Sequence, residues 1–151
     1  MSDNLRVRRY RESDWPEWLR MARELFSEED IENDIAEMRE FLARVDGAII
    51  VASREAGGPL AGYVEVGARS VVDGCATSPV GYIEALWVDP DVRRQGLARA
   101  LLDAAEKWSA EQGYKEMGSD VLIDNDVSHE THRKAGYTEV SRVITYRKDI
   151  L

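Results

Sequence analysis

The spacing of hydrophobic and polar residues changes several times along the chain, and each spacing predicts a different element. Residues 5–9 alternate apolar and charged side chains, which predicts a strand with one buried face. A helix is predicted from residue 14 or 15 to about residue 26. Ser13 is its expected cap, and Pro16 falls in the first turn, where its missing N–H is tolerated.

A second amphipathic helix is predicted over residues 28–44, with Ser27 as its cap, because apolar residues recur there at steps of three and four. The outer face of this helix is acidic, since residues 27–46 hold eight carboxylates and only two arginines. Most of these carboxylates are expected to be solvated, but together they would attract a cationic molecule.

Three strands are predicted in the middle of the chain. Residues 48–53 and 60–66 form short apolar runs on either side of a turn rich in Gly and Pro, which predicts an antiparallel pair. Residues 67–79 show no periodicity and are expected to form a loop. A buried strand follows over residues 80–88 and ends before Asp89-Pro90, because proline cannot donate to a strand ladder.

The C-terminal part predicts helices and strands in alternation. A strongly amphipathic helix is expected over residues 97–111, a strand over 115–122, a polar helix over 125–135, and one or two final strands over 137–148. No repeat or linker interrupts this order. We therefore expect one α/β (α+β) domain over residues 1–151.

Composition and charge narrow the function. An apolar fraction of 44% and a charged fraction of 32% are typical of a globular protein. The formal charge of −9 argues against nucleic-acid binding and favours a cationic partner. No segment approaches the roughly 18 apolar residues of a membrane span, and the single Cys75 leaves no intrachain disulfide. We expect a cytoplasmic protein that binds no membrane.

The turn between residue 88 and the helix at 97 carries the most informative chemistry. A helix N-terminus presents unpaired N–H groups and a positive dipole potential, so it can bind an anion. Small residues in the turn let a diphosphate approach the backbone, and three arginines add positive charge. The candidate phosphate-binding residues are Arg93, Arg94, Gln95, Gly96, Leu97, Ala98 and Arg99.

This turn resembles a known coenzyme-binding loop. Arg93-x-x-Gly96-x-Ala98 is similar to the Gln/Arg-x-x-Gly-x-Gly/Ala loop that binds the pyrophosphate of acetyl-coenzyme A in the GNAT superfamily of N-acetyltransferases. Asn125-x-x-Ser128, followed by His132, resembles a later segment of that superfamily. The resemblance implies a GNAT fold, with about four helices around a mixed, mostly antiparallel sheet of about six to seven strands. It also implies that Asn125, Ser128 and His132 lie near the pantetheine arm.

Four segments within residues 73–148 show a closer similarity: Asp73-Gly74-Cys75 followed by Ser78-Pro79, Ile83-Glu84-Ala85-Leu86-Trp87-Val88, Glu116-Met117-Gly118-Ser119-Asp120, and Arg142-Val143-Ile144-x-Tyr146-Arg147-Lys148. They resemble a subgroup of aminoglycoside 6′-N-acetyltransferases. Phe26 and Val71 stand where that subgroup places aromatic residues against sugar rings, and the difference leaves the acceptor open. The subgroup commonly forms homodimers through its C-terminal strands. The resemblance therefore implies a cationic amine as acceptor, acetyl-coenzyme A as co-substrate, and a homodimer.

Acyl transfer from a thioester to an amine needs a neutral nucleophile, a stabilised oxyanion and a protonated leaving thiolate. The resemblance implies that pantetheine pairs with the backbone of residues 86–88, from Leu86 through Trp87 to Val88, and that the N–H of Leu86 polarises the thioester. Strand alternation predicts that Glu84 shares a face with Leu86, where it could bind the ammonium or take its proton.

Each acidic candidate has a plainer alternative. Glu84 could be a charge at an irregular strand edge, and Asp120 could be either a second anionic site residue or the cap of the next turn. Glu139 is a third, weaker candidate for binding the acceptor.

The two histidines suggest an acid rather than a metal site. His132 occupies a position where the superfamily often has a tyrosine that protonates the thiolate, although a solvated histidine would fit equally well. His129 and His132 lie three residues apart, whereas a His-Glu-x-x-His site needs a spacing of four, so no metal is predicted.

The sequence thus predicts an acetyl-coenzyme A-dependent acetyltransferase that acts on a primary amine by direct transfer, most simply the 6′-amine of an aminoglycoside antibiotic. Two alternatives stay open. The acceptor could be a polyamine, a metabolite or a protein lysine, or the chain could be a non-catalytic acetyl-coenzyme A-binding module of the same fold.

Overall fold

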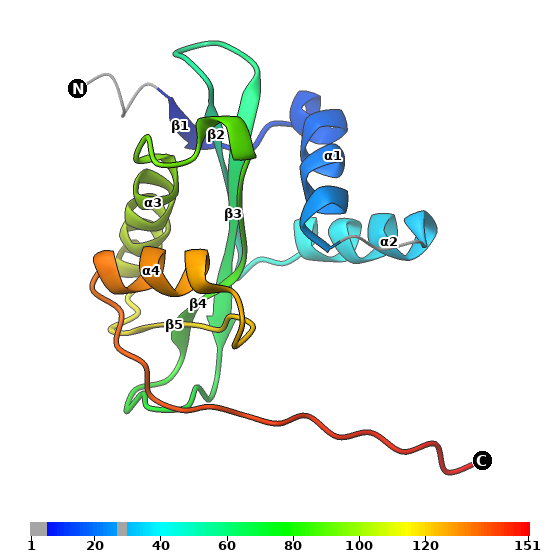
Figure 1. Cartoon of the computed structure of the whole chain (residues 1–151), viewed down its shortest axis with the longest axis vertical. Helices are drawn as coiled ribbons and strands as arrows, with labels where there is room; N and C mark the ends of the chain where they lie inside the picture. The colour runs from blue at the N-terminus through cyan, green and yellow to red at the C-terminus, as the bar shows by residue number, and fades with distance from the viewer. Residues whose placement is uncertain (1–5, 27–29) are drawn as a thin grey trace.

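A five-stranded sheet with the strand order β1-β2-β3-β4-β5 runs through the middle of the molecule (Figure 1). The first three neighbouring pairs are antiparallel, and β4 and β5 are parallel. The computed structural model describes residues 6–26 and 30–151. Its strands are β1 (Val7–Arg9), β2 (Ala48–Ser53), β3 (Leu60–Arg69), β4 (Val80–Val88) and β5 (Met117–Ser119).

Helices cover both faces of the sheet. They are α1 (Trp15–Phe26), α2 (Ile31–Leu42), α3 (Leu97–Glu111) and α4 (Asp126–Lys134), with 3₁₀ turns at Glu12–Asp14 and Pro90–Val92. Figure 1 shows α1 and α2 on one side of the sheet and α3 on the other, with α4 near the β5 end. No helix in the described part of the chain is long and apolar enough to cross a membrane.

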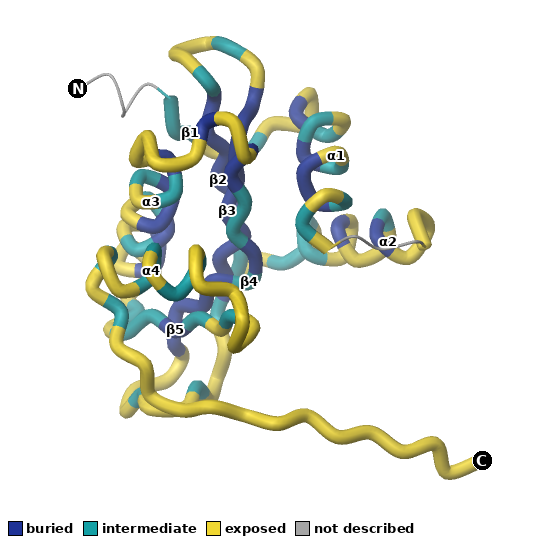
Figure 2. The backbone as a smooth tube through the Cα atoms, in the orientation of Figure 1, coloured by how far each residue is buried: buried dark blue, intermediate teal, exposed yellow. Residues whose placement is uncertain are grey.

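Alternate residues of the central strands build two separate cores. The face toward α3 packs Val64, Val66 and Ile83 against α3. The face toward α1 packs Val51 and Tyr63 against the fully buried Trp18. This division explains why all of β2 and most of β3 and β4 are buried (Figure 2).

A bulge interrupts the pairing of β3 with β4. Glu65 is paired with Ala85, but the next residue, Val66, is paired with Ile83, so Glu84 is the extra residue of β4. A bulge bends the strand and resets the alternation of side chains between the two faces. Its position decides which side chains enter the candidate site.

The mixed, mostly antiparallel sheet flanked by four helices confirms the predicted class, although the sheet has five strands and not six to seven. The predicted bounds of β2, β4 and α3 are confirmed to the residue. The predicted cap Ser27 lies outside the described residues, and the observed cap of α2 is Asp30, which accepts a hydrogen bond from the Asn33 N–H at 3.1 Å. Ser13 is not a helix cap, because it lies inside the 3₁₀ turn that precedes α1.

The predicted strands at the C-terminal end are wrong for this chain. Residues 138–151 form no strand and are exposed throughout (Figure 2). Figure 1 shows this segment running away from the sheet, so its backbone has no neighbouring strand to pair with. The strand predicted over 115–122 shrinks to the three residues of β5 for the same reason, since only those residues lie against β4.

Candidate active site

The turn before α3 exposes the N–H groups of the helix start. Gly96 is the N-cap of α3 in a left-handed conformation, with φ 84°, and no side chain caps the helix. A Cβ built on Gly96 meets no atom within 4 Å, so the space above the turn is open. The first N–H groups of a helix lack carbonyl partners within the helix. This turn can therefore bind an anion through its backbone.

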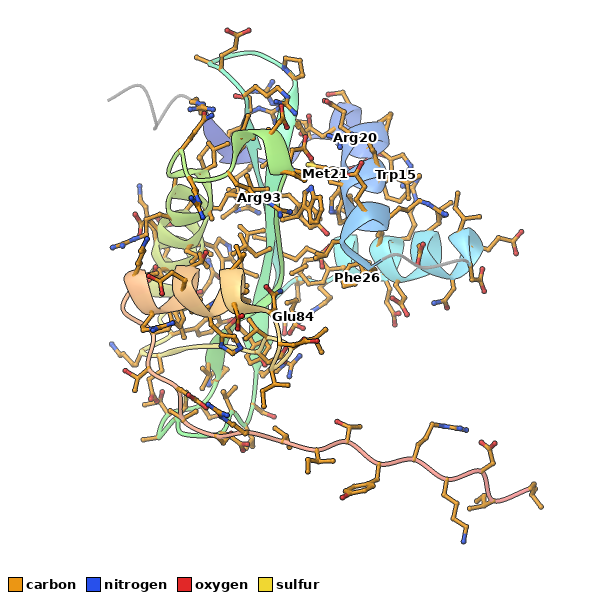
Figure 3. All side chains as sticks on the ribbon, viewed as in Figure 1. Trp15, Arg20, Met21, Phe26, Glu84 and Arg93 are labelled. Carbon is orange, nitrogen blue, oxygen red and sulfur yellow. The ribbon has the colours of Figure 1, made fainter. Side chains whose placement is uncertain are left out.

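Two arginines of the turn bind neighbouring elements, and a third is exposed. The Nε of Arg93 donates to the carbonyl oxygen of Val88 at 2.8 Å, and its guanidinium lies 4.9 Å from the ring centroid of Trp87 (Figure 3). Arg99 binds Asp103 and the carbonyl oxygen of Lys134. Arg93 and Arg99 thus brace the turn against β4 and α4, while Arg94 and Gln95 are exposed beside it.

The sheet opens next to this turn. The pairing of β4 with β5 runs from Gly81↔Met117 to Ile83↔Ser119 and does not extend to residues 84–88. The backbone of Leu86, Trp87 and Val88 therefore has a free edge on the β5 side. That edge can accept an extended ligand, such as a pantetheine arm, in place of a strand.

The bulge places Glu84 on a different face from the one predicted. Leu86 packs toward α3, whereas Ala85 and Trp87 pack toward α1, and Glu84 lines a cavity on that second side. The prediction that Glu84 and Leu86 share a face is therefore wrong. Regular alternation fails because Glu84 is the extra residue of the bulge.

A cavity of about 210 Å³ lies between the sheet and the helices α1 and α2. Phe26 on α1 and Glu84 on β4, which are both labelled in Figure 3, are among its lining residues. Four of its lining residues are carboxylates and four are apolar. The complete lining is Ala22, Phe26, Asp34, Glu37, Met38, Phe41, Glu65 and Glu84.

A chain of contacts ties Glu84 to Asp120. Arg69 donates to both carboxylate oxygens of Glu84, at 3.0 and 2.8 Å, and its guanidinium lies 3.7 Å from the ring centroid of Tyr82. The Tyr82 hydroxyl donates to Asp120 at 2.5 Å. Burial and the Asp120 carboxylate both raise the pKa of Tyr82, so its hydroxyl stays protonated. Glu84 and Asp120, both predicted for the site, thus belong to one network.

Two carboxylates of the cavity wall are buried and were not predicted. Asp34 is 7% exposed and lies 3.6 Å from Arg23. Glu65 is 8% exposed and lies on β3, opposite Ala85. The run from residue 60 to 66 looked uniformly apolar apart from Glu65, and that lone charge in a buried strand was the signal for a site residue.

His132 reaches the end of β5 from α4. Its Nδ1 donates to the Ser128 carbonyl oxygen at 2.8 Å, and its Nε2 lies 2.8 Å from the Ser119 Oγ. Ser119 belongs to the last β4–β5 pair, so His132 stands at the point where the strands separate. Asn125 caps α4 by accepting a hydrogen bond from the Ser128 N–H.

Two residues predicted to bind the acceptor lie elsewhere. Val71 is 82% exposed in the loop after β3 and does not line the cavity. Glu139 lies in the exposed C-terminal segment and pairs with Arg142. Neither joins Phe26 and Glu84, because β3 carries the chain beyond the cavity before residue 71, and residue 139 follows the last helix.

Comparison with known proteins agrees with this geometry. Residues 9–137 match the Acetyltransferase (GNAT) family. An aminoglycoside N(6')-acetyltransferase type 1 from Klebsiella aerogenes is 33% identical over 148 residues, which cover 95% of this chain and 96% of that protein. A second one, from Serratia marcescens, is 35% identical over 134 residues, which cover 88% and 91%.

Solved structures give the same answer. The structure of AAC(6')-Iy in complex with the bisubstrate analogue CoA-S-monomethyl-acetylneamine matches with a TM-score of 0.87 at 30% identity, covering 95% of this chain and 97% of the other. The aminoglycoside 6'-N-acetyltransferase AAC(6')-IG from Acinetobacter haemolyticus matches with a TM-score of 0.86, also at 30% identity, covering 95% and 98%. The chain belongs to the GNAT family of acetyltransferases, and the GNAT fold predicted from its sequence is confirmed.

Proposed function

We propose that this chain is an aminoglycoside 6′-N-acetyltransferase that uses acetyl-coenzyme A and confers antibiotic resistance, and that residues 1–151 form one acetyltransferase domain. The observation that carries this proposal is the position of the acidic cavity. Its four carboxylates line a space that begins at the β4 bulge, directly beside the free edge of residues 86–88. A polyamine sugar needs such a negative site, and the relatives named above act on aminoglycosides.

The coenzyme would lie along the free edge of β4. The N–H groups of residues 95–99 would bind its diphosphate, and the backbone of Leu86, Trp87 and Val88 would pair with pantetheine. Asn125 and Ser128 would flank the arm from α4. These roles are supported by the open space above Gly96 and by the absence of β5 pairing beyond Ile83.

The acceptor would enter the cavity with its amine toward the bulge. Glu84 and Asp120 would attract the ammonium group, and Phe26 would contact the sugar. The N–H of Leu86 would stabilise the oxyanion that forms when nitrogen attacks the thioester carbon. His132 would then protonate the thiolate, since an imidazolium is a suitable acid for a thiol with a pKa of about 8.5.

We also propose that the chain forms a homodimer in the cytoplasm. The support is the exposed C-terminal segment, in which Val143, Ile144 and Tyr146 are each more than 75% exposed. An extended run with apolar side chains and free backbone groups is stable only when it is covered. A second copy offers the same segment in return, as the symmetry of a dimer requires. The single Cys75 is compatible with a reducing compartment.

An acceptor screen tests the proposed function. The purified chain is incubated with acetyl-coenzyme A and, separately, with several aminoglycosides, spermidine and a lysine peptide, and the products are analysed by mass spectrometry. We expect a mass increase of one acetyl group on aminoglycosides that carry a 6′-amine and none on those that have a 6′-hydroxyl. Acetylation of spermidine or the peptide alone would reject the aminoglycoside assignment.

A further inference from the structure

Glu65 stands out because it is a buried carboxylate outside every ion pair of the described chain. It lies in the part of β3 that is otherwise wholly uncharged, from residue 60 to 68, and it is 8% exposed. Its side chain points to the face that holds Tyr63, toward α1 and α2, and lines the acidic cavity. Burying a carboxylate without an ion-pair partner is costly, so such a residue calls for a functional explanation.

The strand register puts Glu65 beside the centre of the site. Glu65 is directly opposite Ala85, which is the residue between Glu84 and Leu86. Directly paired residues of antiparallel strands have Cβ atoms about 4.5 to 5.5 Å apart on the same face. The Glu65 carboxylate therefore starts on the far side of β4, one strand away from the backbone edge where the thioester is expected, and on the face that lines the cavity.

The charges around Glu65 come from every neighbouring element. From α2, Asp34 and Glu37 line the same cavity, and from α1, Arg23 reaches Asp34. From the segment after α2, Arg44 lies against Gly67, two residues along β3, and binds Asp46 and the Ala68 carbonyl oxygen. From β4 comes Glu84, with Arg69 bound to it. Each arginine is thus engaged with another group.

We infer that Glu65 is the residue of this chain that takes the proton from the acceptor's ammonium group. This role rests on the proposed function in one respect only, which is that the acceptor is a primary amine. The ammonium transfers one proton to a Glu65 oxygen, directly or through one water. The neutral amine then attacks the thioester carbon, the C–N bond forms, and the C–S bond breaks. The second proton lost by nitrogen matches the one gained by the thiolate, and Glu65 returns the first to solvent.

Glu84 is less suited to this step. Its two oxygens accept hydrogen bonds from Arg69, at 3.0 and 2.8 Å, which stabilise it as an anion and occupy one acceptor site on each oxygen. Burial raises the pKa of Glu65 to about 7, an effect that Trp18 and Arg44 partly offset and Glu84 reinforces. A general base works best when its pKa lies near the working pH. We assign Glu84 to holding the acceptor and Glu65 to moving its proton.

The test compares Glu65→Gln with Glu65→Asp and with Glu106→Gln, which removes a partly buried carboxylate on α3, outside the cavity lining. The acceptor is the amine that the wild-type chain acetylates best in the screen described above. If the screen yields no acetylated aminoglycoside, the proposed function is rejected. The Glu65 variants can then still be compared with spermidine or the peptide as acceptor, because every primary ammonium group must lose a proton before it attacks. Rates are measured from pH 5.5 to 9.

We expect Glu65→Gln to lower kcat about 100-fold and to leave the KM for acetyl-coenzyme A unchanged. In the wild type, kcat/KM should rise with pH in a step centred near pH 7, and the Gln variant should lack this step. The ionisation of the amine itself contributes the same rise to every variant. Glu65→Asp should recover at least a tenth of wild-type kcat and keep the rise, and Glu106→Gln should keep both kcat and the rise.

The inference would be overturned if Glu65→Gln kept a kcat within threefold of wild type, or if its pH profile had the same shape. A flat wild-type profile between pH 5.5 and 9 would overturn it without any variant. Binding of acetyl-coenzyme A by each variant reports whether it is folded, and Glu65→Asp keeps the test decisive if the Gln variant does not fold.

Discussion

Arg69 binds both oxygens of Glu84 from the neighbouring strand, so the acidic residue at the bulge has a fixed orientation before any acceptor arrives. The same guanidinium stacks on Tyr82, which donates to Asp120. A planar fork of donors holds a carboxylate in one plane, which an ammonium group cannot do. Arg69 is therefore expected to set the orientation in which the Glu84 carboxylate binds a substrate.

Arg69→Lys tests this relationship. Loss of one of two charge-assisted hydrogen bonds should lower kcat/KM for the amine about 10-fold and leave the KM for acetyl-coenzyme A unchanged. Initial rates with each substrate varied in turn measure both effects. Arg8→Lys is the matched control, because Arg8 makes the same kind of two-point contact with Asp14 outside the cavity lining. Equal losses in both variants would show that Arg69 has only a structural role.

Gly96→Glu tests the diphosphate site. The new carboxylate fills the open space above the turn and repels phosphate, so the Kd for acetyl-coenzyme A should rise at least about 100-fold. Gly113→Glu is the control. Gly113 lies just beyond the other end of α3, and it has a similar positive φ, 91° against 84°, and equally open surroundings. Calorimetry should show normal binding by the control, and normal binding by both variants would contradict the loop assignment.

Asp89→Asn tests the junction between β4 and the turn. Asp89 is 4% exposed and accepts hydrogen bonds from Arg20, Arg54 and the Trp87 indole. Burial by itself would raise the pKa of Asp89, but these donors outweigh it and hold the pKa below its ordinary value. Removing the charge should cost about 2 kcal/mol in the free energy of unfolding, measured in urea.

Asp103→Asn is the control for that measurement. Asp103 is 59% exposed and pairs with Arg99 one helical turn away, so its loss should change stability by less than about 0.5 kcal/mol. Similar values for the two variants would show that Asp89 does not organise the junction.

The pH dependence of the free energy of unfolding tests the raised pKa of Glu65 independently of activity. Because burial raises its pKa from 4.5 to about 7, the folded chain keeps a proton that the unfolded chain releases. Stability should therefore fall by about 3 kcal/mol as the pH rises between these two values. In Glu65→Gln this fall should be absent, so that the variant is more stable than wild type at pH 8. Parallel unfolding curves at all pH values would show that Glu65 is an ordinary carboxylate.

The proposed homodimer, formed through the C-terminal segment, can be detected by light scattering. Replacing Ile144 and Tyr146 with Asp should convert a dimer into a monomer, because charges would replace the apolar side chains that a second copy covers. Val45→Asp is the control, since Val45 is 99% exposed at another place. A monomeric wild type, or a double variant that stays dimeric, would contradict this proposal.

Elements with clear periodicity and clear ends were predictable from the sequence. β4 ends at Val88, two residues before Pro90, and α3 lies between Gly96 and Gly113, so local chemistry defines both elements. The face of Glu84 was not predictable, because one extra residue in β4 shifts the alternation and depends on pairing with β3. The C-terminal residues have a strand-like pattern, but a strand also needs a neighbour, which the sequence pattern does not supply.

One part of the candidate site was predictable from the sequence, and another part was not. The phosphate loop was predictable because its parts are contiguous. The buried pair of Asp34 and Glu65 comes from two distant segments, and only the packing of α2 against β3 brings them into one cavity with Glu84.

A crystal structure with coenzyme A and an aminoglycoside bound tests the central claim most directly. We predict that the diphosphate accepts hydrogen bonds from the N–H groups of residues 95–99. An amino group of the sugar should lie in the cavity, within hydrogen-bonding distance of Glu65 or Glu84. A diphosphate bound elsewhere, or a sugar bound outside the cavity lined by Phe26 and Glu84, would contradict the account.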